Sequence, residues 1–181
     1  MQIFAISGSL RAESTNTLIL KATAELIGDN GVHFYQYGDL GLLPHFNPDL
    51  DNDHPPELVT QLRKALKASD ALLVCSPEYI HGIPGSLKNA LDWLASSGEL
   101  DGMPVGIINA TPSIDGATFA QQALQEVLKV LSNNIIPEAV VRIGAVKTKM
   151  DPQGKITDPE LTKTLRTAVA ALSEAKFLRS C

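Results

Sequence analysis

The stretch QIFAISGSLRAESTN, residues 2–16, joins an apolar run to a loop of small, hydroxyl-bearing and amide-bearing residues that carries one arginine. The apolar run at 2–7 is typical of a buried strand, because it is short and turn residues follow it directly. Apolar residues at helical spacing resume at about 15–28. The stretch therefore predicts one strand, one loop and one helix in succession.

The rest of the chain repeats this alternation. Four more apolar runs predict strands at 32–37, 71–76, 105–110 and 139–144. Amphipathic patterns predict further helices at about 56–69, 84–97, 117–132 and 158–178. The first, third and fourth strands are almost entirely apolar, as expected for strands that helices cover on both faces.

This pattern predicts an α/β fold. We expect a flavodoxin-like three-layer sandwich, in which a five-stranded parallel sheet of order 2-1-3-4-5 has helices on both faces. Such a sheet binds ligands at the carboxyl ends of its strands, beside the point where the strand order reverses. The loops that matter most are then 8–16, 77–83 and 111–117.

Length and composition narrow the class of protein. A chain of 181 residues suits a single domain over 1–181. Its formal net charge of −5 argues against a nucleic-acid partner, which would need clustered lysine and arginine. No apolar run approaches the roughly 18 residues of a membrane span, so we expect no membrane partner and a cytoplasmic location. The two cysteines, Cys75 and Cys181, are too few for a disulfide framework or a cysteine metal site.

The first loop has the groups that bind a phosphate. Hydroxyl, amide and guanidinium side chains lie just before the free N–H groups of a helix start, at Ser9, Arg11, Ser14, Asn16 and Thr17. The loop lacks the lysine motif of a triphosphate site, the glycine motif of a dinucleotide site and the cysteine of a phosphatase. These exclusions favour a terminal monophosphate. The alternative is a polar turn in which a hydroxyl only caps the helix.

The second loop suits a planar ligand. The sequence SPEYIHGIPGSLKNALDWL, residues 76–94, contains prolines and glycines that shape the backbone just before a helix. Backbone N–H and C=O groups of such a loop can contact the edge of a heteroaromatic ring, and Tyr79 offers an aromatic surface.

Together, GSLRAESTN and SPEYIHGIPGSLKNALDW resemble the NADPH-dependent FMN reductase family, flavodoxin-like proteins that include quinone and chromate reductases. The resemblance implies FMN as cofactor and assigns its phosphate to Ser9, Arg11, Ser14, Asn16 and Thr17. It implies ring contacts from Pro77, Glu78, Tyr79, Ile80, His81 and Gly82. Ser113 is a further candidate, in a third loop, ATPSIDGA at 110–117, that departs from the glycine-rich turn of many relatives.

The resemblance also implies the chemistry. Hydride would pass from NADPH or NADH to FMN and then to a small acceptor such as a quinone, flavin, chromate, azo or nitro compound, in ping-pong order. The cofactor carries this reaction, so we expect no catalytic side chain and no metal. Two alternatives are an FMN electron carrier and a non-enzymatic flavin-binding module. Electron carriers shield both flavin faces with aromatic groups, whereas TPSIDG has none, which favours the reductase. We expect a homodimer, with a tetramer as the alternative.

Several residues keep two interpretations. The long segment 38–56 is either a solvated connection or a rim of the active site. Trp93 belongs either to the core or to a contact with another subunit. Cys75, at the end of an apolar strand, is expected to be buried and inert, and His81 is expected to support the loop or contact the ring.

Overall fold

The computed structural model describes residues 1–28, 30–114 and 116–179. Parallel strands form one sheet of order β2-β1-β3-β4-β5, as predicted. The strands are β1 (Gln2–Ser7), β2 (His33–Tyr37), β3 (Ala71–Cys75), β4 (Val105–Ala110) and β5 (Ile135–Ile143). The α-helices are α1 (Thr15–Ile27), α2 (Glu57–Lys67), α3 (Gly85–Asp92), α4 (Thr118–Leu131) and α5 (Pro159–Arg179). Short 3₁₀ turns lie at Leu40–Leu42, Pro48–Leu50 and Val146–Thr148.

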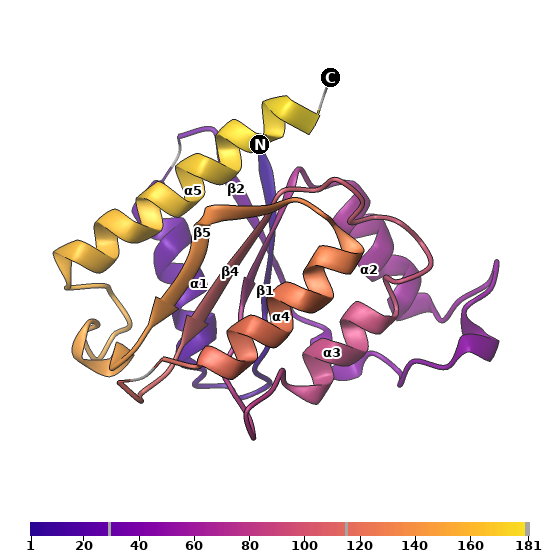
Figure 1. Cartoon of the computed structure of the whole chain (residues 1–181), viewed down its shortest axis with the longest axis horizontal. Helices are drawn as coiled ribbons and strands as arrows, with labels where there is room; N and C mark the ends of the chain where they lie inside the picture. The colour runs from indigo at the N-terminus through magenta and orange to yellow at the C-terminus, as the bar shows by residue number, and fades with distance from the viewer. Residues whose placement is uncertain (29, 115, 180–181) are drawn as a thin grey trace.

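Two apolar clusters, one on each face of the sheet, make up the core. Helices α2, α3 and α4 contribute to one cluster, and α1 and α5 contribute to the other. Figure 1 shows the same division, with α1 and α5 on one side of the strands and the other three helices opposite. β3 is fully buried, as its continuous apolar run predicted. The flavodoxin-like three-layer sandwich is therefore confirmed.

Two elements differ from their predicted bounds by more than two residues at one end. α3 ends at Asp92 rather than near 97, because the Trp93 carbonyl accepts hydrogen bonds from the Arg63 side chain instead of continuing the helix. β5 begins at Ile135, four residues before its predicted start. Pro137 argued against a strand here, because proline has no N–H to donate to a neighbouring strand. An edge strand tolerates proline on the side that pairs with no neighbour.

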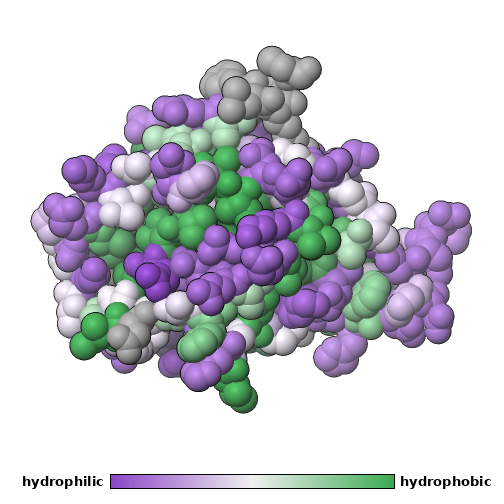
Figure 2. Space-filling view, in the orientation of Figure 1, coloured by the Kyte–Doolittle hydropathy of each residue, from purple (hydrophilic) through white to green (hydrophobic). Residues whose placement is uncertain are grey.

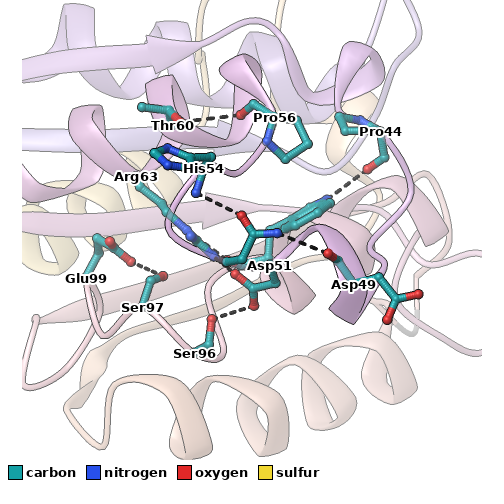
Figure 3. A network of polar contacts seen from close by, with 12 residues as sticks. Pro44, Asp49, Asp51, His54, Pro56, Thr60, Arg63, Ser96, Ser97 and Glu99 are labelled. Carbon is teal, nitrogen blue, oxygen red and sulfur yellow. Dashed lines mark hydrogen bonds and ion pairs between the residues drawn. The ribbon is translucent and has the colours of Figure 1, made fainter.

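The segment 38–56 is held against α3. Asn89 and Trp93 each donate a side-chain hydrogen bond to the Pro44 carbonyl, at 3.0 and 2.8 Å. The Phe46 ring packs edge-on against Trp93, which is fully buried and so belongs to the core. Further along, Asp51 pairs with Arg63 at 2.8 Å and accepts a 2.6 Å hydrogen bond from Ser96 (Figure 3). The segment is thus docked on the fold. Gly38 and residues 40–42 also line a cavity with Ser9 and Arg11, and a role at the rim of the active site stays a prediction.

None of the helices within the described ranges is long and apolar enough to span a membrane. The cytoplasmic location stays a prediction. Cys181 lies outside the described residues.

Candidate functional site

The loop between β1 and α1 combines a helix cap with a polar cavity wall. Ser14 is the N-cap of α1, and its hydroxyl accepts a 3.4 Å hydrogen bond from the Thr17 N–H. The capping interpretation is therefore correct for Ser14. The same residue also lines a cavity, so capping and ligand binding are not exclusive here. The first N–H groups of a helix have no intrahelical acceptor, and those that the Ser14 cap does not use are available to an anion.

This cavity, of about 370 Å³, brings together four chain segments at the carboxyl edge of the sheet, three of which were predicted. The three predicted walls come from the first loop, from the start of the second loop and from the end of β4. They include Ser9, Arg11, Ser14, Thr15, Asn16, Pro77, Glu78, Tyr79 and Thr111. We call it the inner cavity. It brings together the predicted phosphate ligands except Thr17, and half of the predicted ring contacts.

Lys147 also lines the inner cavity and was missed by the sequence analysis. It lies in the 3₁₀ turn that follows β5, at the same edge of the sheet as the other loops. The signal was present, because the connection after β5 must leave from the carboxyl end of a strand next to β4. The Arg11 guanidinium and the Lys147 ammonium give the cavity two cations, which suits a phosphate dianion. Glu13, which also lines it, was missed as well.

Asn16 joins elements as well as lining the cavity. Its amide nitrogen donates to the Ala110 carbonyl at 3.1 Å, and its amide oxygen accepts from the Ala110 N–H at 3.2 Å. The Cys75 thiol lies 3.3 Å from that oxygen. Asn16 thus ties the start of α1 to the ends of β3 and β4. Its role in phosphate binding stays a prediction.

Thr17 lies on the opposite side of the first loop. Its hydroxyl donates a 2.9 Å hydrogen bond to Ser7, and its side chain lines a separate cavity that also includes Tyr37. Thr17 does not line the inner cavity, but the cavity that it lines shares Ser9 and Arg11 with the inner one, and its phosphate contact stays a prediction.

The second loop contains a tight turn. Tyr79 and Gly82 exchange two backbone hydrogen bonds, at 3.2 and 3.0 Å, and the intervening Ile80 and His81 have φ of 49° and 54°. Two central residues with positive φ define a type I′ turn. The turn directs the Ile80 side chain fully into solvent. Neither Ile80 nor Gly82 lines the inner cavity or the cavity next to it.

Glu78 connects the second loop to α4. Its carboxylate accepts a 2.9 Å hydrogen bond from the Ala120 N–H, in the first turn of that helix. The N-cap position of α4 is Ala117, whose side chain cannot cap. Glu78 therefore supplies a cap from another part of the chain, and the positive end of the α4 dipole offsets its negative charge.

A second cavity, of about 270 Å³, adjoins the first and shares Glu78 and Thr111 with it. We call it the outer cavity. Besides Glu78, two predicted residues line it, His81 and Ser113, together with residues from the first turn of α4. One of these is Phe119, whose ring stacks on His81 with 4.4 Å between centroids. The absence of aromatic residues from TPSIDG therefore does not mean that this side of the site lacks an aromatic ring, because the following helix contributes one.

The third loop is held by the connection after β5. The Thr111 N–H donates to Ile143 at 3.0 Å, and its carbonyl accepts from Val146 at 3.1 Å. A side chain at Gly144 would come within 2.3 Å of the Ile114 carbonyl oxygen. This close approach explains the glycine, and it fixes the third loop beside Lys147.

The Cys75 thiol lies beneath the site and takes no part in its surface. The residue is fully buried, and burial raises the pKa of its thiol far above the usual range. A thiol that stays protonated is a poor nucleophile. The prediction of an inert buried cysteine agrees with this geometry.

Comparison with known protein families adds to the evidence from the site. The family model described as NADPH-dependent FMN reductase matches residues 1–148. The chain belongs to the NADPH-dependent FMN reductase family. The family predicted from the two motifs is thereby confirmed, and with it the enzyme class, an oxidoreductase that uses FMN and NAD(P)H.

Individual relatives of this family match almost the whole chain. An NAD(P)H-dependent FMN reductase of Pseudomonas aeruginosa is 30% identical, over 95% of this chain and 93% of its own. A 2-hydroxy-1,4-benzoquinone reductase of a Burkholderia species is 30% identical, over 92% and 91%. The solved structure of FerB, a flavoenzyme NAD(P)H:(acceptor) oxidoreductase from Paracoccus denitrificans, superposes with a TM-score of 0.86 at 30% identity, covering 98% of each chain.

The site fits the cofactor of the family. The inner cavity is lined by two cationic residues, by hydroxyl groups and by the N-terminus of α1, which suit the FMN phosphate. Pro77, Glu78 and Tyr79 form another wall of the inner cavity, and Tyr79 offers an aromatic surface to a planar ring system there, beside the outer cavity. Arg11, Lys147, Ser9 and the first turn of α1 would hold the phosphate. The loop after β3 would lie along the ring.

Proposed function

We propose that this chain reduces a small acceptor with NADPH or NADH through bound FMN, in ping-pong order. The observation that carries the proposal is the pair of adjoining cavities, one lined by two cationic residues and one with an aromatic wall. When bound, FMN would take a hydride from NAD(P)H and pass two electrons to the acceptor. For a quinone, the hydride and one proton from solvent together yield the hydroquinone and NAD(P)⁺.

The protein's part is to bind, orient and stabilise. Arg11 and Lys147 would hold the phosphate end, which fixes the position of the ring relative to the outer cavity. The Glu78 carboxylate is paired with the N-terminus of α4, which offsets its negative charge. It would therefore repel the negative charge of a reduced flavin ring less than an unpaired carboxylate would. Backbone N–H groups of the 77–83 loop would favour that charge.

Among acceptors, quinones have the most support. One relative is a 2-hydroxy-1,4-benzoquinone reductase, and others from Pseudomonas putida and Escherichia coli are quinone reductases. The outer cavity is bounded by an aromatic ring and by hydroxyl groups, which suit a planar molecule with carbonyl oxygens.

The test is reduction of the FMN-loaded protein without air. NADPH or NADH alone should bleach the oxidised flavin absorbance, and a quinone should then restore it. Initial-velocity plots against both substrates should give parallel lines, and intersecting lines would contradict the ping-pong order. An electron carrier would keep its flavin oxidised until a partner protein is added. A non-enzymatic flavin module would show no sustained turnover.

We also infer that the chain forms a homodimer through its edge strand. Figure 2 shows apolar atoms gathered between α5 and α4, over β5. A groove there, of about 510 Å³, is lined mainly by apolar residues: Ile136, Pro137, Ala170, Ala171 and Ala175. Val130, on α4, is 86% exposed. A second copy of the chain would cover this surface and the open edge of the sheet.

A further inference from the structure

The stacked rings of His81 and Phe119 form one wall of the outer cavity. Their centroids lie 4.4 Å apart, with 27° between the ring planes. Phe119 remains 52% exposed although His81 covers part of it. A ligand in the outer cavity can therefore reach the phenyl ring.

The backbone that presents His81 is held in an unfavourable conformation. Type I′ turns favour asparagine and glycine at their two central positions, and a β-branched residue such as Ile80 at φ 49° is an outlier. Strain of this kind persists where the surroundings fix the backbone, and it clusters at functional sites. Two contacts fix this turn on α4, the Glu78 hydrogen bond to Ala120 and the ring stack. The position of the aromatic wall is thus set by the fold.

Hydroxyl groups line the cavity beside this wall. Thr111 and Ser113 both face it, and the Thr111 hydroxyl oxygen accepts a 3.2 Å hydrogen bond from the Ser113 N–H. A hydroxyl that accepts in this way can still donate its own proton. The outer cavity therefore pairs an aromatic surface with hydrogen-bond donors for a carbonyl oxygen.

We propose that Phe119, supported by His81, determines specificity for planar aromatic acceptors by stacking against them in the outer cavity. This inference rests on the proposed function and assigns acceptor choice to the first turn of α4. Stacking requires a flat ring, so the residue should discriminate a quinone from a compact, non-planar acceptor such as ferricyanide.

The direct test is binding of 1,4-naphthoquinone to the FMN-loaded protein without NAD(P)H, so that no electrons move. Phe119→Leu keeps an apolar side chain but removes the ring, and it should raise the Kd about 3- to 10-fold, as expected for loss of one aromatic contact. Phe119→Tyr keeps the ring and should stay within about twofold of the wild type. The matched control is Tyr35→Leu, because Tyr35 is also an exposed aromatic residue that contacts another ring, on β2. This substitution should leave the Kd for naphthoquinone unchanged.

Two further measurements separate this role from others. In turnover, Phe119→Leu should raise KM for the quinone by the same factor and leave KM for ferricyanide unchanged. The Kd for FMN should not change. An unchanged naphthoquinone Kd in Phe119→Leu, no naphthoquinone binding by the wild type, or a weakened FMN Kd would each overturn the proposal. A wild type that binds naphthoquinone through Phe119 but oxidises no NAD(P)H would instead refute the proposed function alone.

Discussion

The two cationic residues that line the inner cavity make a prediction about single residues. Arg11→Ala or Lys147→Ala should weaken FMN binding roughly 10-fold or more, because each removes a charge-assisted contact to the phosphate. Titration of the apoprotein with FMN, followed by flavin fluorescence, measures this change. Lys129→Ala is the control, since Lys129 lies on α4 in an exposed pair with Glu126. Equal affinities in all three variants would argue against a phosphate in this cavity.

Ile80 offers a second prediction, about stability. Its side chain contributes no packing, whereas its positive φ costs free energy. Ile80→Asn should therefore raise the free energy of unfolding by about 1 kcal/mol, since asparagine tolerates this conformation. Ile114→Asn provides the comparison in urea unfolding, because Ile114 is also largely exposed but has no positive φ. A similar effect at both positions would show that hydrophilicity rather than backbone strain is responsible.

The sequence predicted some residues of the site better than others. Ser9, Arg11 and Ser14 lie in a motif directly after a strand, so their place at the carboxyl edge follows from the topology. Lys147 and Phe119 carry no motif. The predicted strand order puts Lys147 at the carboxyl edge of the sheet, but the position of the Phe119 ring depends on how α4 docks, which local patterns do not encode.

At the scale of an element, the docked segment 38–56 makes stability depend on pH. A hydrogen bond from the Ser96 hydroxyl, and a second one from Arg63, hold the pKa of the Asp51 carboxyl below the ordinary value of an aspartate. The stabilisation is fully present above that value and is lost as the pH falls through the lowered pKa. The difference in unfolding free energy between the wild type and Asp51→Asn should thus shrink below about pH 4. Asp53→Asn, an exposed neighbour, is the control, and a difference that stays constant from pH 6 to pH 3 would contradict this account.

Strands and helices with a clear hydrophobic pattern were predicted closely. The errors in their bounds lie where long-range side-chain contacts override that pattern. β1 and β4 have their predicted bounds. α3 is shorter because Arg63, from another helix, captures the Trp93 carbonyl, and no local pattern reveals that contact. β5 is longer because its proline is tolerated only at the edge of the sheet, which requires the strand order to be known first.

For the whole molecule, the apolar surface along β5 predicts the oligomeric state. Val130→Glu or Ala170→Glu should convert a dimer to a monomer in sedimentation at micromolar concentration, because each places a charge in the proposed interface. Leu42→Glu, which changes an exposed apolar residue far from β5, should leave the dimer intact. A wild type that sediments as a monomer would refute the interface.

The sealed position of Cys75 has a practical consequence. In a Cys181→Ser background it is the sole thiol of the chain, and it sits in the middle of the sheet. An alkylating reagent could reach it only when the core opens around the central strands. The rate of Cys75 alkylation would therefore report how often the core opens. The decrease in the alkylation rate at saturating FMN would then measure how much the ligand suppresses opening of the core. This measurement needs no optical signal from the flavin.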